Sequence, residues 1–208
     1  IRLINSRLIV AIAMLIEEPR RCSWCTGDAL YQRYHDEEWG VPIFDSIALF
    51  ERLVLESMQA GLAWITVLKK REHMKAQFYG FDPFKLARCS EPHVQAWLQD
   101  SGLIRHRGKL EALVRNAQLT IAEEDFSDLL WQFAPEVSLR NRRVAQPASQ
   151  TAESQAMARL LKNRGFGFVG PTTCYAFMQS VGMVNDHAED CWRYEVCSNH
   201  HDRADIDR

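Results

Sequence analysis

The chain has 208 residues, of which 47% are hydrophobic and 25% are charged, and its formal net charge is -2. A chain of this length buries one substantial core, so we expect one compact unit. The near-neutral charge excludes a protein that binds nucleic acid through its overall positive charge, as histones do. Any such binding has to come from a local basic patch.

The first twenty residues differ in character from the rest. An unbroken apolar run at residues 8–16 follows Arg2 and Arg7 and superficially resembles the core of a signal peptide. The run is too short to span a bilayer, and no clear small-residue cleavage site precedes the charged residues after it. We therefore interpret residues 1–20 as an extra helix or an N-terminal extension of uncertain origin, and expect no membrane association.

Helix signals follow one another along the chain, with their own start and stop residues. Asp45 is typical of an N-cap, and Gly61 is typical of a helix end. Asp82 before Pro83 places a capping side chain ahead of a proline at the first helical position. The expected helices cover residues 46–60, 64–78, a short stretch from 83, 91–100, 105–122, 125–133, 151–165 and 171–181.

Two segments lack this periodicity. Residues 134–150 collect Pro, Gln, Ser and Arg, which predicts an exposed linker or flexible loop. Residues 198–208 are polar and are expected to form a disordered tail. No segment shows sustained alternation with period two, so we predict an all-α fold in which residues 21–197 form a single folded unit.

Four potential metal ligands lie in pairs near the two ends of the chain. Cys22 and His35 lie near the beginning, while His187 and Cys191 have an H-x3-C spacing that we expect to place them on one face of a helical turn. Two thiolates and two imidazoles suit tetrahedral zinc and leave no position for substrate, so the site would be structural. From spacing alone, four unrelated residues remain the alternative, because other ligands compete: Cys25, Cys197, His200 and His201. A redox role for the C-x2-C pair at 22 and 25 is disfavoured, since no βαβ pattern surrounds it.

A glycine turn with basic residues lies between two expected helices. From Leu103 to Asn116 there are four basic residues against Glu111 alone, which makes the region positive in a slightly acidic protein. A helix start exposes backbone N–H groups that favour phosphate, and basic side chains add attraction without reading sequence. The candidates for DNA contact are Gly102, Arg105, His106, Arg107 and Lys109. A solvated charged helix face is the alternative, and residues 69–71 either extend the patch or form ordinary helix surface.

Aromatic residues gather in a short stretch that also contains an isolated carboxylate. Glu56 lies on a largely apolar helix, so its side chain must be exposed, paired or functional. Aromatic walls with one acceptor suit a purine flipped out of a duplex, and a cationic base suits them better. Leu62, after Gly61, has the place and shape to fill the gap that a flipped nucleotide leaves. The aromatic candidates are Trp24, Tyr31, Tyr34, Trp39 and Trp64. Ordinary core aromatics and a surface glutamate are the alternative.

Several strings in this chain resemble the DNA-3-methyladenine glycosylase I family. They are YQRYHDEEWG from Tyr31, LESMQAGLAWI from Leu55, IRHR from Ile104, GFGFVGPTT from Gly165 and VNDH from Val184. The resemblance runs in order from about residue 21 to residue 191. It implies a helix-hairpin-helix fold, with residues 102–109 as the hairpin and residues 21–197 as one catalytic unit.

The resemblance also implies roles for individual residues. Structural zinc would be held by Cys22, His35, His187 and Cys191. The base would be bound by Trp24, Tyr31, Tyr34, Glu56 and Trp64. Gly61 and Leu62 would form the inserted loop. Met58 departs from the glutamine of some relatives, which would alter the floor of the pocket.

The resulting hypothesis is a base-excision repair enzyme that flips out and hydrolytically removes N3-methyladenine from alkylated double-stranded DNA, releasing free 3-methyladenine. Because the alkylated base is a cation, it departs as a neutral molecule and needs little acid catalysis. Glu56 would bind its edge and is the catalytic candidate, while no residue for water activation is identified. We expect a monomer in the bacterial cytoplasm, acting at the nucleoid. The rivals are a non-catalytic sensor of alkylated DNA and a zinc hydrolase, and a closed four-ligand site disfavours the latter.

Overall fold

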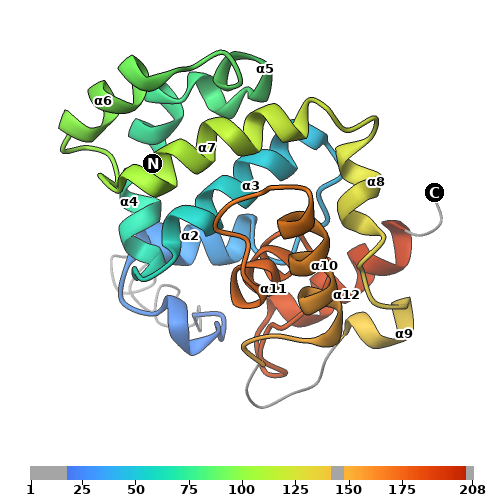
Figure 1. Cartoon of the computed structure of the whole chain (residues 1–208). Coiled ribbons are helices and arrows are strands. Elements are labelled where there is room, and N and C mark those ends of the chain that lie inside the picture. The colour runs from blue at the N-terminus through green and yellow to red at the C-terminus, as the bar shows by residue number, and fades with distance from the viewer. Residues whose placement is uncertain (1–17, 142–147, 205–208) are drawn as a thin grey trace, which may run out of the picture.

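The computed structural model describes residues 18–141 and 148–204, and this part of the chain folds into helices and loops without a β-strand (Figure 1). The all-α prediction is confirmed. The helices are η1 (Ser23–Cys25), α2 (Ala29–Glu37), α3 (Ser46–Gln59), α4 (Trp64–Gln77), η2 (Tyr79–Phe81), α5 (Pro83–Leu86), α6 (Glu91–Gln99), α7 (Arg107–Thr120), α8 (Phe126–Trp131), α9 (Val137–Arg140), α10 (Ala152–Asn163), α11 (Pro171–Ser180) and α12 (Arg193–Ala204).

The predicted helices are present, with ends that differ by a few residues. Their starts follow the capping signals of the sequence. The Asp45 carboxylate accepts a hydrogen bond from the Ala48 backbone N–H at 2.8 Å, and Asp82 does the same for Phe84 at 2.9 Å. Each bond satisfies a backbone donor that has no partner within the helix.

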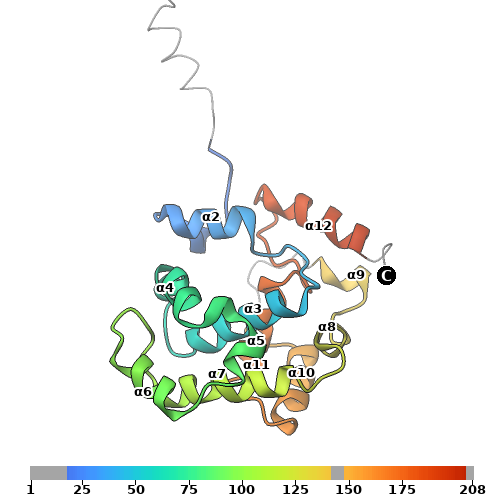
Figure 2. The ribbon, with the colours of Figure 1, turned by 90° about the horizontal axis from the view of Figure 1, so that it is seen from above.

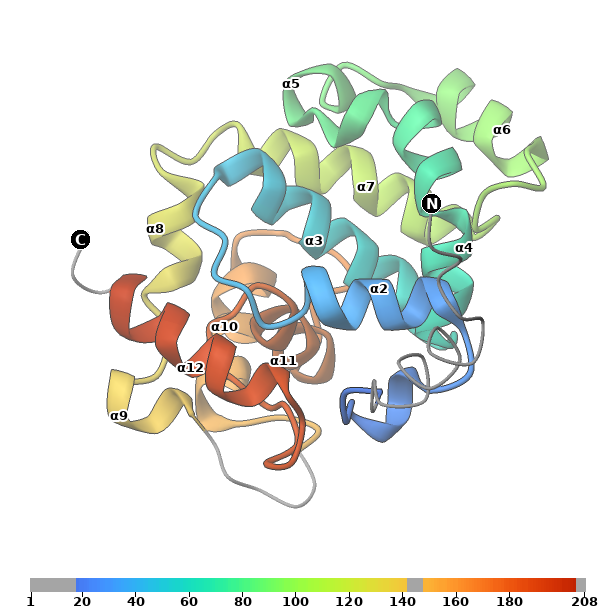
Figure 3. The same cartoon turned by 180° about the vertical axis from the view of Figure 1, so that it is seen from behind.

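Helix α3 lies at the centre of the molecule, with α4, α7, α8 and α11 packed against it (Figures 1 and 3). Its buried residues cover nearly the whole circumference, which is the pattern of a helix enclosed on all sides. The buried set includes three polar side chains, Arg52, Glu56 and Ser57. A buried polar group needs a hydrogen-bond partner or a functional role, so a functional site is expected beside this helix.

The two ends of the described chain meet on one side of α3. Helices α2 and α12 both lie on this side, seen from above in Figure 2. The Trp192 backbone N–H donates to the Arg20 carbonyl oxygen at 3.0 Å, which joins the segments before α2 and α12. This meeting of distant segments brings the predicted metal ligands into reach of one another.

Three sequence expectations need correction. Helix α2 was not predicted, because its alternation of tyrosine with charged side chains gives no clean apolar stripe. The expected linker at 134–150 contains α9, whose Arg140 side chain is buried and donates to the Pro135 carbonyl oxygen at 2.8 Å. The expected disordered tail begins as helix, since α12 continues to Ala204 and Ser198 bonds to the Tyr194 carbonyl oxygen.

Some expectations fall outside the described residues. These are the N-terminal extension up to residue 17, residues 142–147 of the linker and the last four residues. Within the described ranges, every helix is too short or too polar to traverse a lipid bilayer.

Candidate functional site

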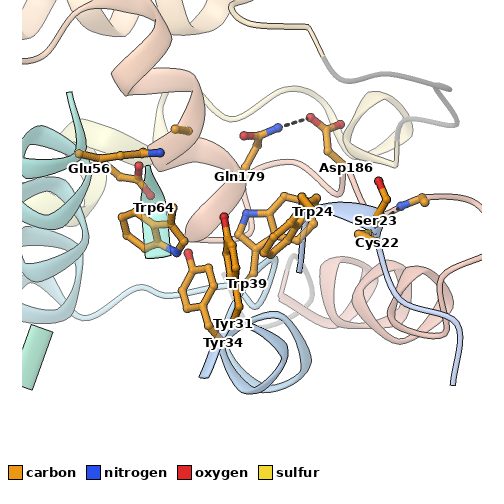
Figure 4. Close-up of a pocket in the computed structure, with 13 residues that line it drawn as sticks. Cys22, Ser23, Trp24, Tyr31, Tyr34, Trp39, Glu56, Trp64, Gln179 and Asp186 are labelled. Carbon is orange, nitrogen blue, oxygen red and sulfur yellow. Dashed lines mark hydrogen bonds between the residues drawn. The ribbon is translucent and has the colours of Figure 1, made fainter. Parts of the chain in front are cut away.

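A cavity of about 290 Å³ lies between η1, α2, α3, α11 and the start of α4 (Figure 4). Aromatic and polar side chains both contribute to its lining. The residues that line it are Cys22, Ser23, Trp24, Tyr31, Tyr34, Trp39, Glu56, Gln59, Trp64, Ala176, Gln179, Asp186 and Ala188. All five predicted base-binding residues are therefore brought together at one cavity.

The aromatic rings form walls at angles to one another. The ring centroids of Tyr34 and Trp64 are 5.2 Å apart, and those of Trp24 and Tyr31 are 5.0 Å apart. Tyr34 is also covered by the Arg52 guanidinium, 5.6 Å from its ring centroid. Flat, rigid faces of this kind bind a planar base by stacking, and they attract a cationic base through the ring quadrupoles.

Glu56 extends from α3 into this aromatic setting (Figure 4). The residue is 5% exposed, so it is not the surface glutamate of the alternative interpretation. Burial raises the pKa of its carboxyl to about 8, while the positive charge of Arg52 and a hydrogen bond with Ser180 act in the opposite direction. The carboxyl therefore keeps its proton at neutral pH unless a cation lies beside it, and a cationic ligand would favour the ionised form.

Two polar atoms of the cavity residues are buried without a hydrogen-bond partner among the described residues: Trp64 Nε1 and Asp186 Oδ1. An unpaired buried donor or acceptor costs about 1–3 kcal/mol. One is a donor and the other an acceptor, so a polar ligand or water beside them would satisfy both kinds of group.

The four predicted metal ligands form one buried cluster next to the cavity. The ligand atoms of Cys22, His35, His187 and Cys191 all lie within 4.8 Å of one another. Cys191 Sγ is 3.3 Å from His35 Nε2, and the sulfur atoms of Cys22 and Cys191 are each 3.6 Å from His187 Nδ1. Tetrahedral zinc, with bonds of about 2.3 Å to sulfur and about 2.0 Å to nitrogen, places such atoms about 3.5 Å apart. The cluster thus fits a metal ion of this type.

The surroundings of the two histidines support the same interpretation. The remaining ring nitrogen of His35 is 2.8 Å from an Asp36 carboxylate oxygen, and that of His187 is 3.1 Å from the Trp39 carbonyl oxygen. Metal-ligating histidines usually donate their second N–H to such acceptors, which fixes the ring orientation.

One detail of the metal prediction is wrong. His187 and Cys191 lie in the loop before α12 and not on a helical turn. A hydrogen bond from the Cys191 backbone N–H to the Ala188 carbonyl oxygen, 2.9 Å long, closes a tight turn that brings the two ligands together. The competing Cys25 and Cys197 are buried thiols outside the four-residue cluster.

The glycine turn joins α6 to α7 as a hairpin, and neighbouring side chains hold its backbone. Asp100 accepts a hydrogen bond from the Gly102 N–H at 2.8 Å, and the Lys70 ammonium donates to the carbonyl oxygens of Ser101 and Gly102. A Cβ at position 102 would lie 2.4 Å from the ring of His73, so that ring would have to move to admit a larger residue. Lys70 is thus part of the support of the hairpin.

The predicted DNA-contact residues do not all lie on the surface. Arg105, His106 and Arg107 are exposed, and Arg107 pairs with Glu91 at 2.8 Å. Lys109 is 5% exposed, and its ammonium donates to the carbonyl oxygens of Met58 and Ala60 at 2.8 and 2.6 Å. The assignment of the Lys109 side chain to DNA contact is therefore corrected, because its ammonium already binds carbonyl oxygens at the C-terminal end of α3.

The loop between α3 and α4 turns at Gly61 and leaves Leu62 at the surface. Gly61 adopts a φ of 79°, a left-handed conformation that favours glycine, and Leu62 is 41% exposed. Met58 does not form the pocket floor, because it is 1% exposed and its neighbour Gln59 lines the cavity instead.

With this geometry in place, the chain can be compared with known proteins. Residues 24–194 match the model of the methyladenine glycosylase family. The chain belongs to this family. It is 49% identical over 177 residues to a DNA-3-methyladenine glycosylase of Haemophilus influenzae, an alignment that covers 82% of this chain and 96% of that relative.

Solved structures agree with this assignment. A crystal structure of 3-methyladenine DNA glycosylase I, 47% identical, superposes with a TM-score of 0.79 over 83% of this chain and 98% of that one. A variant of 3-methyladenine DNA glycosylase I in complex with 3-methyladenine, 34% identical, gives a TM-score of 0.75 over 83% of this chain and 96% of that one.

The sequence analysis missed three amide or carboxylate residues of this family member's cavity: Gln59, Gln179 and Asp186. Gln59 could have been found, since it is three residues after Glu56 and one helical turn along α3. Gln179 and Asp186 come from a distant part of the chain, and the packing of α11 against α3 brings them to the same cavity as Glu56. Asp186 was read only as part of the string before His187.

Proposed function

We propose that this chain is a DNA glycosylase that removes N3-methyladenine from alkylated double-stranded DNA and releases the free base. The observation that carries the proposal is the buried Glu56 carboxyl in an aromatic cavity of base size. The names of its relatives, and the 3-methyladenine bound to one of them, support the same substrate.

The cavity would select the lesion by its charge. A purine stacked against Tyr34 and Trp64 would share the cavity with Glu56, whose carboxyl is ionised only when a positive charge compensates its burial. An unmodified adenine is neutral and therefore supplies no positive charge to stabilise the ionised Glu56 carboxylate. The alkylated base is a cation, so it stabilises the carboxylate and is retained.

DNA would be held at two places outside the cavity. The hairpin and its exposed Arg105 would contact the phosphate backbone, and Leu62 would occupy the gap left in the base stack. Neither contact reads sequence, which suits an enzyme that searches for damage at any position.

We propose further that the four-ligand cluster holds structural zinc. The ligands would be Cys22, His35, His187 and Cys191, and bound zinc would cross-link the chain ends that build one side of the cavity. Four protein ligands leave no place for substrate, which argues against a zinc hydrolase. We also propose that residues 21–197 act as one catalytic unit, as a monomer, on nucleoid DNA in the bacterial cytoplasm.

The test is release of 3-methyladenine from methylated duplex DNA, measured by chromatography, for wild type and Glu56→Gln. We expect release by the wild type and a rate at least about tenfold lower for the variant, because the neutral amide cannot compensate a cation. Glu51→Gln is the matched control on the same helix, since Glu51 pairs with Arg71 and does not line the cavity.

Two results would contradict the proposal. If neither protein releases base while both still bind methylated DNA, the chain is a sensor of alkylated sites. If Glu56→Gln releases base at the wild-type rate, the role given to Glu56 is wrong.

A further inference from the structure

The cavity contains a second carboxylate besides Glu56. Asp186 lies in the loop after α11, is 6% exposed and lines the cavity. Among the described residues of the lining, it and Glu56 are the two acidic side chains. Figure 4 shows them at separate places along the cavity, with Gln179 between them.

The two oxygens of Asp186 have different surroundings. Oδ2 accepts hydrogen bonds from the Tyr175 hydroxyl and from Gln179 Nε2, the latter at 2.8 Å (Figure 4). Oδ1 is buried and has no hydrogen-bond partner in the described part of the chain. One oxygen therefore fixes the side chain, and the other remains available as an acceptor.

The backbone of Asp186 is fixed on both sides. The Asn185 side chain donates to the Tyr194 carbonyl oxygen at 3.0 Å and accepts from the His187 backbone N–H at 3.3 Å. His187 belongs to the Cys–His cluster. A carboxylate held this firmly keeps its position when charge develops nearby, which is the condition for efficient electrostatic stabilisation.

Removal of a cationic base leaves positive charge on the sugar, and Glu56, which binds the base, is not assigned to stabilise that charge. When the bond between C1′ of the sugar and N9 of the base breaks, its electron pair stays with the base, which becomes neutral. Positive charge then develops on the sugar, and a water oxygen adds to C1′ while its proton leaves to solvent. A carboxylate on the sugar side stabilises that charge and orients the water, as in other glycoside hydrolyses.

We propose that Asp186 is a catalytic residue of this reaction: its free Oδ1 accepts a hydrogen bond from the attacking water, and its negative charge stabilises the sugar cation. This inference rests on the proposed glycosylase function. The two carboxylates thus divide the work, with Glu56 on the base and Asp186 on the sugar.

Asp186→Asn tests this assignment with little change in shape. The amide oxygen can still accept from Tyr175 and Gln179, whereas the free acceptor is replaced by an NH2 group and the charge is lost. We expect the single-turnover rate of base release to fall about 100-fold or more. Affinity for free 3-methyladenine, measured by tryptophan fluorescence, and metal content should stay at wild-type values.

Asp190→Asn is the matched control, because Asp190 lies in the same loop with its side chain 68% exposed. Asp186→Ala supplies a second measurement, in which added formate can enter the vacated space. We expect formate to restore part of the lost rate of Asp186→Ala and to leave Asp190→Asn unaffected.

Several outcomes would overturn the proposal. Release by Asp186→Asn within about threefold of wild type would remove Asp186 from the chemistry. Loss of free-base affinity or metal in proportion to the rate, or no rescue by formate, would make it a structural residue of the loop. These results leave the glycosylase function standing, whereas no release by the wild-type chain would refute that function and this role together.

Discussion

The cavity has two sides that are stabilised in different ways. Glu56 and Trp64 belong to helices α3 and α4, whose neighbours enclose them in the core. The opposite side consists of η1, α2 and the loop that carries Asp186. That side is short in regular structure and lies beside the Cys–His cluster. The comparison shows that the α3–α4 side is secured by packing, whereas the proposed zinc would secure the other side by cross-linking the chain ends.

Removing the metal ligands should have the largest effect, and it should act on the cross-linked side. We expect Cys22→Ala and His187→Ala to lose bound zinc and to destabilise the fold by several kcal/mol, on the order expected for structural zinc sites. Metal analysis and thermal unfolding measure the two effects.

Cys25→Ala is the matched control, because Cys25 is a buried thiol outside the cluster. It should keep the metal. Stoichiometric zinc in both ligand variants would refute the ligand assignment and the division of the cavity into two kinds of side.

The pH dependence of stability should report on the packed side. Burial raises the pKa of Glu56 from 4.5 to about 8. Between these values the folded protein holds a proton that the unfolded chain has released, so this residue makes the free energy of unfolding decrease as pH rises through that window. The contribution is on the order of a few kcal/mol.

Chemical unfolding of wild type and Glu56→Gln across this pH range tests the sign. The difference between the two curves should slope in the stated direction and level off above about pH 8. Parallel curves would mean that Glu56 titrates normally and is not enclosed by the aromatic walls.

The two sides also differ in how well sequence predicts them. The helices of the packed side follow from capping residues and periodicity, because both act over one or two turns. Glu56 was singled out for the same reason, as a carboxylate on an apolar helix. The metal ligands were proposed from residue type and spacing, although their local structure was predicted wrongly.

What sequence could not supply is the proximity of segments far apart in the chain. Asp186 lies at the cavity because its loop follows α11, which packs against α3, and because Tyr175 and Gln179 of α11 hold its side chain. Lys109 illustrates the same limit, since a lysine in a basic turn looks like a phosphate ligand until the end of α3 is known to lie against it. Local patterns reveal helices, but tertiary contacts decide which charges remain free.

Substitution of Lys109 should have the smallest effect, and it tests whether this residue stabilises the packed side or contacts DNA. Its ammonium binds carbonyl oxygens at the end of α3, directly before the Gly61 loop. Lys109→Met should therefore lower the free energy of unfolding in urea by about 1–3 kcal/mol and leave the salt dependence of DNA binding unchanged.

Arg105→Gln is the matched change on the exposed side of the hairpin. It should alter stability by less than about 0.5 kcal/mol and reduce the slope of log K against log salt by about 1. If Lys109→Met lowers that slope as much as Arg105→Gln does, the lysine contacts phosphate in the complex. The end of α3 would then have to open when DNA binds, and the packed side would be less rigid than its burial implies.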